Sequence, residues 1–518
     1  MFRKLILDIF DQKESQVLKS LERKMPAEFI SNRINFPRPF AFVIDDMGWI
    51  QGSSMGEKVP RGPYRGGVKR VFGRDDYRHV VEIAQKVGVR VQGLFVLSEL
   101  DRNNILAGYP STTFQRGRWD NSVNINEEQL EMVNYVVGQS AFLEFGFHGT
   151  GHEHWPEDGV QKRAEWYNLE DDHPWPEEVM RAHVEAARSI LEQYGLTPSA
   201  GHSFPETFVP GAYSFYWNPR GEFSLGKLMR ETGVKYANTN FTVIPELDPP
   251  AELNGGGFDH GLHVLGRLNY GNLWHQLRSL PKVPIDMQPT DIVETHWINW
   301  LASDDFLQPE VSALWVDYYR QVARLPERYP AKNTAQLHAQ WLYKKYAVIS
   351  MISEGEIAID NTRMPSEAYE NGIAGNLLLK FKLREGEHIS NATVNDEPAA
   401  VFLEQDGYGY LYLPVLQPKK YSLRYEIGGH YPSFGVVAGG TYNVLGLTKN
   451  EERATILINM YGRQDVNIYC ERPFEVSSDR KDLLVVQVSY DEPARKLTVM
   501  LEATDYQGVT GTITLLWP

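Results

Sequence analysis

The sequence predicts an α/β domain built on a parallel sheet or barrel, followed by an all-β region. Between residues 40 and about 300, short apolar runs alternate with amphipathic helical segments, as in parallel sheets and barrels. Beyond about residue 350, apolar residues instead recur at every second position, which is typical of strands with one buried face. Polar residues gather just after several expected strands, where parallel folds build their sites.

The expected elements follow the apolar spacing and the stop signals in order along the chain. Apolar positions at helical spacing predict a helical extension over 1–30, and Gly195 and Gly233 mark the ends of two later helices. The predicted strands of the first half are 41–44, 89–97, 142–147, 234–237 and 291–294, and the predicted helices are 77–87, 127–137, 177–195 and 225–232.

A helical stretch from 311 to about 346 precedes the β region and is expected to link the two halves. The expected organisation is therefore an extension over 1–30, an α/β domain over 31–310, a helical linker over 311–350 and a β-sandwich region over 351–518. The β region is either one sandwich or two subdomains with a seam near 435–440. The predicted strands are 376–383, 399–403, 408–413, 421–427, 454–459, 466–470, 483–489, 496–503 and 511–517.

Composition excludes several classes of function. The 52 Lys and Arg against 67 Asp and Glu give a net charge of −15, which argues against nucleic acid and anionic membranes as partners. Cys470 is the single cysteine, so a disulfide framework and a Cys-rich zinc module are excluded, and His and carboxylates remain as metal ligands. Asp8 and Asp11 interrupt an N-terminal run that imitates a signal peptide, and no long apolar segment follows; we expect a cytoplasmic protein.

Three groups of residues follow predicted strands and carry chemistry. Asp45 and Asp46 end the first strand, and in extended backbone their side chains diverge, so that one can face a metal and the other a reacting water; the alternative is that one caps the next element. His148 and His152 have the i, i+4 spacing that lets two imidazoles share one cation, with His154 as a competing ligand. His296 follows the last strand and suits a general acid near neutral pH.

Taken in this order, the Asp-Asp pair, the HxxxH pair and the last histidine resemble the polysaccharide deacetylase family, the NodB-homology or carbohydrate esterase family 4 group, over about residues 36–300. The resemblance implies a deformed (β/α) barrel and a metal-dependent hydrolase that removes acetyl groups from an N- or O-acetylated carbohydrate. It implies Asp45 as general base, Asp46, His148 and His152 as metal ligands, and His296 as general acid. The implied metal is zinc, with cobalt, nickel, manganese and iron as alternatives.

The chain departs from the family pattern at two orienting residues. Where the family has an arginine before a proline as partner of the base, this chain reads Gly-His-Ser-Phe-Pro at 201–205, which leaves His202 or Arg267 as candidate substitutes. The acid expected near the fourth motif is replaced by Tyr-Ala-Asn-Thr-Asn at 236–240. Trp49, Trp155 and Trp297 lie near the motifs and are candidates for stacking on sugar rings, or else for core packing.

Two alternative functions stay open. One is a glycosidase of related barrel fold that uses Asp45 with Glu206 or Glu294 as its carboxylate pair. The other is a carbohydrate-binding or scaffold protein on a non-catalytic barrel of deacetylase type. A serine hydrolase is disfavoured, because Ser203 and Ser214 lack the context of a nucleophile elbow. The sequence leaves the oligomeric state open.

Overall fold

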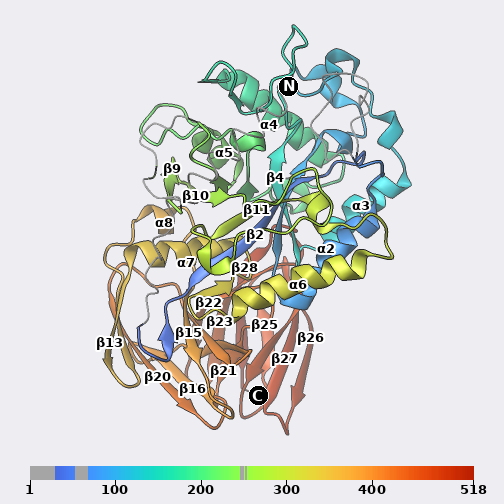
Figure 1. The fold of residues 1–518 in the computed structure, drawn as a ribbon. Coiled ribbons are helices and arrows are strands. Elements are labelled where there is room, and N and C mark those ends of the chain that lie inside the picture. Colours follow the sequence, from blue (N-terminus) through green and yellow to red (C-terminus); the bar gives the residue numbers. More distant parts are fainter. Residues whose placement is uncertain (1–29, 53–67, 245–249, 251–253, 518) are drawn as a thin grey trace.

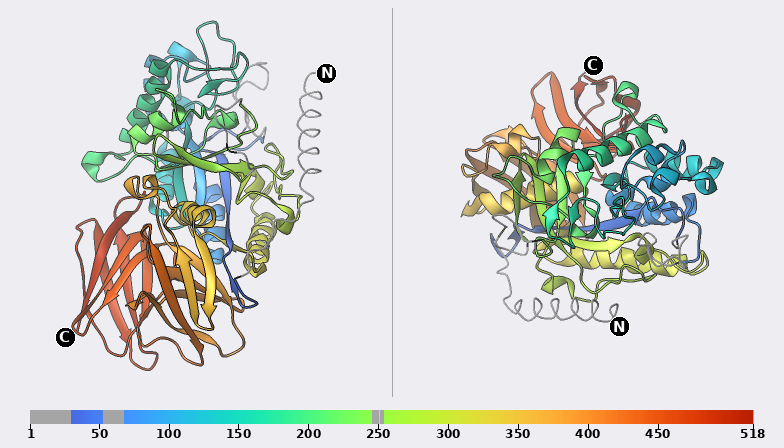
Figure 2. Two further views of the ribbon diagram at one scale, coloured as in Figure 1. Left: turned by 90° about the vertical axis from the view of Figure 1, so that its left-hand side faces the viewer. Right: turned by 90° about the horizontal axis from the view of Figure 1, so that it is seen from above.

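The computed structural model describes residues 30–52, 68–244, 250 and 254–517, and these residues form two tiers (Figures 1 and 2). The upper tier is an α/β barrel, and the lower tier is a layered arrangement of β-sheets. The helical extension predicted over 1–30 lies outside the described residues, apart from residue 30. In the part of the chain that the structure describes, none of the helices has the length and apolar character needed to cross a membrane.

The barrel is a closed ring of parallel strands, as the alternation of strands and helices predicts. Each strand pairs in parallel with its neighbours in the ring, and the last strand pairs back with the first through Ile292–His296 and Ala41–Asp45. The order around the ring is β2 (Arg38–Met47), β3 (Val91–Val96), β4 (Leu143–Gly149), β7 (Thr207–Phe208), β8 (Tyr236–Thr239), β10 (Leu262–Leu268) and β11 (Ile292–His296). Two strands of the ring were not predicted from the sequence: β7, which has only two residues, and β10.

Helices cover the outside of the ring, and their capping residues explain where they begin and end. Asn126 and Ser224 cap α3 and α5 by accepting hydrogen bonds from backbone N–H groups of the first turn. The left-handed Gly88 and Gly233 end α2 and α5. The helices are α2 (Arg74–Val87), α3 (Glu127–Gly138), α4 (Glu177–Glu192), α5 (Leu225–Thr232) and α6 (Gln308–Arg324).

The segment expected to be a helical linker packs against both tiers. Within it, α6 lies along α2 on the barrel (Figure 1), and β12 (Arg328–Pro330) pairs in parallel with the start of β2. The helix α7 (Thr334–Tyr346) contacts β2 of the barrel and β15 of the lower tier. The helical spacing of the apolar residues in this segment could be predicted from the sequence, but the elements that they pack against could not.

The lower tier consists of three sheets that share one apolar core. The largest sheet runs without interruption through the seam predicted near 435–440, because β21 pairs with β18 on one side and β24 on the other. Its strands are β1 (Ile34–Asn35), β15 (Leu377–Lys382), β19 (Tyr408–Leu413), β18 (Val401–Gln405), β21 (Gly435–Val437), β24 (Arg463–Tyr469), β27 (Lys496–Ala503) and β26 (Leu483–Asp491).

Two smaller sheets complete the lower tier, one from each half of the region. The first contains β13 (Val348–Ser353), β14 (Glu356–Asp360), β20 (Lys420–Gly428), β16 (His388–Val394) and β17 (Glu397–Pro398). The second contains β22 (Asn443–Lys449), β23 (Arg453–Met460), β28 (Val509–Leu516) and β25 (Glu475–Ser478). The barrel followed by a β-sandwich region is thus present, and the two halves share the largest sheet.

The lower tier lies against the amino ends of the barrel strands. Gln507 donates to the carbonyl of Phe145 in β4 at 3.0 Å, and Arg90, just before β3, donates to the carbonyl of Tyr506 at 3.3 Å. The carboxyl ends of the strands therefore face away from the β-sheets. The predicted catalytic and metal-binding residues lie at or just beyond these ends: Asp45, Asp46, His148, His152 and His296.

Candidate metal and acid-base site

The two aspartates that end β2 reach different groups because the strand is irregular there. Asp45 keeps its place in the ladder, opposite His296 of β11. Between Ile44 and Met47 the register with β3 shifts, and Asp46 takes a left-handed backbone with φ 63°. Aspartate tolerates this region better than most residues. The bulge turns Asp46 toward His148 of β4 and His152 of the loop after it, while Asp45 faces β10.

Asp46, His148 and His152 come together as the sequence predicts for a metal site. The Nε2 atoms of His148 and His152 each lie 3.5 Å from Oδ1 of Asp46, and one ligand atom of each residue lies within 4.8 Å of the others. His148 and His152 are buried, and Asp46 is partly exposed. His154 does not join them, because its ring stacks on Trp175 with centroids 3.8 Å apart.

Both imidazoles are oriented by hydrogen bonds at the nitrogen that points away from Asp46. His148 donates from Nδ1 to the carbonyl of Val209 at 2.6 Å, and His152 donates from Nδ1 to the carboxylate of Glu153 at 3.0 Å. With the proton on Nδ1, a neutral ring presents the lone pair of Nε2 to the centre of the group. This arrangement of oriented histidines with one carboxylate fits a divalent transition metal.

The loop between the two histidines closes tightly around Glu165. Its carboxylate accepts hydrogen bonds from the backbone N–H groups of Thr150, Gly151 and His152, at 3.0, 3.2 and 3.0 Å. A Cβ atom on Gly149 would lie 2.0 Å from Oε2 of Glu165, and one on Gly151 would lie 2.0 Å from the carbonyl oxygen of Thr112. The glycines are therefore required by close packing of the loop, which sets the position of His152.

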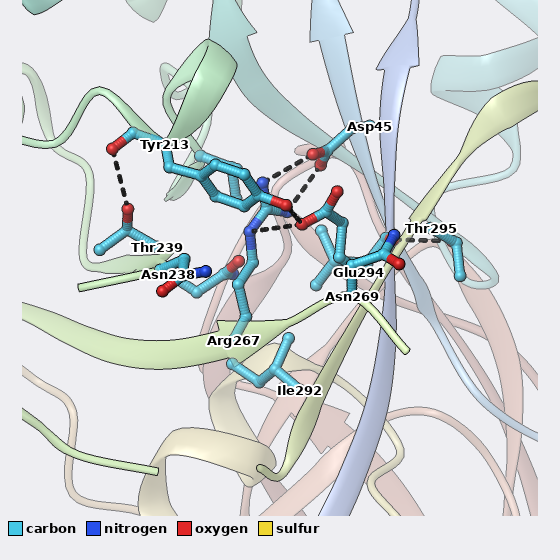
Figure 3. A network of polar contacts seen from close by, with 12 residues as sticks. Asp45, Tyr213, Asn238, Thr239, Arg267, Asn269, Ile292, Glu294 and Thr295 are labelled. Carbon is cyan, nitrogen blue, oxygen red and sulfur yellow. Dashed lines mark hydrogen bonds and ion pairs between the residues drawn. The ribbon is translucent and has the colours of Figure 1, made fainter. Parts of the chain in front are cut away.

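Arg267, on the strand that the sequence analysis missed, binds Asp45 with both nitrogen arms (Figure 3). The two hydrogen bonds measure 2.9 and 2.7 Å, and both side chains are buried. The sequence left His202 and Arg267 as candidate partners of Asp45, and the structure shows that Arg267 is the partner. His202 lies elsewhere, 3.6 Å from Asp505 in the lower tier.

A second carboxylate, that of Glu294 of β11, lies near Asp45 and also faces Arg267 (Figure 3). Its Oε2 is 4.0 Å from Nε of Arg267 and accepts a hydrogen bond from the hydroxyl of Tyr213. Its Oε1 lies 3.7 Å from Nε2 of His296. Asp45, Glu294 and His296 therefore form a compact group beside the metal-ligand residues, with ligand atoms within 4.8 Å of one another.

The charges in this group determine its protonation. Burial opposes ionisation of Asp45, but Arg267, His148 and His296 outweigh it and lower the pKa of Asp45. The pKa of Asp46 is also lowered against burial, chiefly by its hydrogen bond with His148. Burial disfavours a charged His152, yet Glu153 and Asp46 raise the pKa of His152 to about 9. Both aspartates are thus held as anions.

The three candidate tryptophans differ in their surroundings. Trp49 and Trp297 line a small cavity of about 20 Å³ beside Asp46 and His296, and half-buried Trp274 lines it too. Trp297 also packs on Phe72 and Tyr77, with ring centroids 4.3 and 4.4 Å apart. Trp155 lines a different and larger cavity of about 690 Å³. No local pattern marked Trp274, because it lies in a loop outside the motifs.

Of the two glutamates weighed as glycosidase partners of Asp45, only Glu294 is near it. Glu206 immediately precedes β7, at the amino end of the barrel, where it forms an ion pair with Lys235 at 2.5 Å. The carboxyl end of the barrel therefore brings together Asp45, Glu294, Arg267 and His296 with the three metal-ligand candidates.

Comparison with known proteins adds little to this geometry. No family model matches the chain, and no curated protein matches it. Three solved structures of the catalytic module of a family 98 glycoside hydrolase from Streptococcus pneumoniae match with TM-scores of 0.13. One is a complex with the H-disaccharide blood group antigen (10% identity, 86% of this chain), one a complex with the LewisY pentasaccharide antigen (10%, 84%) and one the native form (9%, 86%). The matches span 65–66% of those modules. A likeness this weak supports no conclusion about fold or function.

Proposed function

We propose that this protein is a metal-dependent hydrolase that removes acetyl groups from an N- or O-acetylated carbohydrate, on a barrel of the NodB-homology type. The observation that carries the proposal is the pairing of two groups at one end of the barrel. Asp46, His148 and His152 offer three ligands, and Asp45 and His296 flank them at paired positions of adjacent strands. Three protein ligands with an open position are typical of catalytic zinc sites.

A divalent transition metal, zinc in the first instance, would be held by Asp46, His148 and His152, where it would polarise the acetyl carbonyl and acidify a bound water. Asp45 is suited to accept the proton of that water. Arg267 donates one hydrogen bond to each carboxylate oxygen of Asp45 and so fixes the direction of the carboxylate. A second lone pair on each oxygen of Asp45 can still accept a proton.

His296 is suited to protonate the departing amine or alcohol. Its ring lies at the cavity beside Asp46, and Glu294 faces its Nε2 from 3.7 Å. Tyr213 and Arg267 hold Glu294 in place beside the His296 ring. The sequence offered no orienting carboxylate for His296 near residues 236–240. We infer that Glu294 has this role instead. Proton acceptor and proton donor lie on opposite strands of the β2–β11 pair.

Metal content is the first test of the proposal. Elemental analysis of the purified protein should give about one transition metal per chain, and Asp46→Ala and His148→Ala should each lose it. His173→Ala, at an exposed histidine outside the site, is the matched control and should keep it. If the wild type holds no metal even after incubation with zinc or cobalt, the proposed mechanism fails.

Product analysis separates this proposal from a glycosidase, for which Asp45 and Glu294 are the carboxylate pair that the structure favours. Their ligand oxygens lie within 4.8 Å, near the separation of about 5–5.5 Å between the carboxyl groups of retaining glycosidases. Acetylated sugars should release acetate with an unchanged chain length. Shortened or newly reducing sugars without acetate would instead support the glycosidase, and metal-insensitive binding without any product would support a carbohydrate-binding protein.

A further inference from the structure

A chain of three side chains outside the metal site has the geometry of a serine-hydrolase triad. Oγ of Ser111 lies 3.0 Å from Nε2 of His183, and Nδ1 of His183 lies 2.7 Å from Oε1 of Glu165. The three residues come from distant segments: a loop before α3, helix α4 and the loop after β4. All three are buried, and both distances are those of good hydrogen bonds.

Glu165 is held as the orienting carboxylate of this chain. Besides the hydrogen bond with His183, it accepts the three backbone hydrogen bonds described above, which fix the position of its carboxylate. A carboxylate only accepts hydrogen bonds, so His183 must carry its proton on Nδ1. In the neutral ring, Nε2 then has a free lone pair directed at the Ser111 hydroxyl, as a general base requires.

Ser111 itself has the backbone expected of a constrained nucleophile. Its φ of 58° lies in the left-handed region, where a non-glycine residue is strained and where such strain gathers at functional sites. The main chain is fixed there by the hydrogen bond from the N–H of Trp155 to the carbonyl of Ser111, at 2.9 Å. The hydroxyl has two acceptors for its one proton, Nε2 of His183 and the carbonyl of Pro110 at 2.7 Å.

The serine is also placed where a substrate can reach it. Ser111 lines the cavity of about 690 Å³, together with Tyr109, His154, Trp155 and Arg118. Aromatic rings and an exposed guanidinium thus line the same cavity as Ser111, and its volume is within the range of small-molecule sites. Trp155, a candidate sugar platform from the sequence, belongs to this cavity.

We propose that Ser111, His183 and Glu165 form a second, metal-independent active site that hydrolyses carboxylic esters with small acyl groups. Oγ of Ser111 attacks the ester carbonyl and its proton passes to Nε2 of His183. The C–O bond to the alcohol then breaks, and His183 gives that proton to the leaving alcohol. His183 next takes a proton from a water molecule, which attacks the acyl carbonyl. The acyl–Oγ bond breaks, His183 returns the proton to Oγ of Ser111, and the carboxylic acid leaves. The sum is ester plus water to acid plus alcohol, with Ser111 and His183 catalytic and Glu165 positioning.

Covalent labelling tests the proposal directly. The full chain, treated with EDTA, is incubated with a fluorophosphonate probe, and the modified peptide is identified by mass spectrometry. We expect modification at Ser111, together with hydrolysis of p-nitrophenyl acetate that EDTA does not abolish. Absence of labelling at Ser111, under conditions that label a known serine esterase to completion, would overturn the proposal.

Variants separate catalysis from folding. Ser111→Gly removes the hydroxyl but accepts a φ of 58° without strain, so it should fold and lose both labelling and esterase activity. Ser189→Ala, whose hydroxyl contacts Tyr109 near the same cavity, is the matched control and should label as the wild type does. Undiminished labelling in Ser111→Gly would refute the assignment.

Two further variants test the roles of the other residues. His183→Gln should slow labelling by about 100-fold or more, the usual contribution of a general base. Glu165→Gln should lower the maximal rate of inactivation with little change in probe affinity, which a purely structural role would not produce. Equal labelling rates in His183→Gln and the wild type would overturn the proposal. His148→Ala should leave labelling intact, so failure at the metal site and failure here can be told apart.

Discussion

Replacement of Arg267 by methionine removes the cation that forms two hydrogen bonds with Asp45. Arg267 and Asp45 are 2% and 3% exposed, so the carboxylate left behind cannot turn to water, and Glu294 lies close by with the same charge. Breaking a buried pair from one side typically costs about 3–5 kcal/mol, because an uncompensated charge stays in a poorly solvated place. We expect Arg267→Met to lower the free energy of unfolding by that amount.

The assay is urea unfolding followed by tryptophan fluorescence, with free energies compared at unchanged dependence on urea. Arg181→Met is the matched control, because Arg181 also pairs with two carboxylates, Glu177 and Glu231, but all three side chains are 44% exposed. Exposed pairs contribute about 1 kcal/mol or less. Adding Asp45→Asn to Arg267→Met should recover part of the loss, because it removes the stranded charge.

A loss in Arg267→Met no larger than in Arg181→Met would refute the reasoning. It would mean that Asp45 takes up a proton or reaches water at little cost, so that the pair does not hold Asp45 as an anion. The same result would remove the physical basis for treating Asp45 as a fixed proton acceptor in the proposed reaction.

Three further predictions follow from burial and packing elsewhere in the chain. Burial lowers the pKa of Lys332 to about 7, so between about pH 7 and 10 the unfolded chain binds more protons than the folded one. Stability should rise with pH in this window, by up to ~1.4 kcal/mol per pH unit, and urea unfolding of Lys332→Met at several pH values should show a smaller rise; an equal rise would contradict the assignment. Gly151→Ala should lose about 1–3 kcal/mol of stability through its contact with Thr112, as well as bound metal, whereas Gly138→Ala, which has no neighbour within 4 Å, should be at least as stable as the wild type in thermal melts. Trp297→Ala should cost about 3–5 kcal/mol, whereas half-buried Trp274→Ala should chiefly raise KM for a carbohydrate substrate; the reverse result would show that Trp297 is the sugar platform.

Local patterns were sufficient for much of the fold. Alternation of strands and helices predicted the barrel, and period-two patterning predicted nine strands of the lower tier close to their observed limits. β10 was missed because its sequence, Leu-His-Val-Leu-Gly-Arg-Leu, mixes polar residues and glycine into a buried strand. The sequence left both His202 and Arg267 as candidate partners of Asp45, because the need of a buried aspartate for a cation gives no position in the chain.

The candidate site, like the fold, could be predicted from the sequence only in part. Two features of the site could be predicted from the sequence: the spacing of His148 and His152, and the position of Asp45, Asp46 and His296 directly after apolar runs. Each feature depends only on residues a few positions away in the chain. The left-handed bulge that separates the two aspartates, by contrast, depends on the register of β2 with β3. Ser111, His183 and Glu165 share no motif, since their contacts form only when α4 packs over the loops beyond β3 and β4.

By itself, the sequence determined the order of strands and helices, the change to a β region and the residue types at the strand ends, because these follow from local propensity and from the spacing of apolar side chains. Only the tertiary structure decided that β11 pairs back with β2, that the lower tier covers the amino end of the barrel, and that Arg267 pairs with Asp45. Those outcomes depend on closing a ring over residues more than 200 positions apart in the chain, and on the need of each buried charge for a partner.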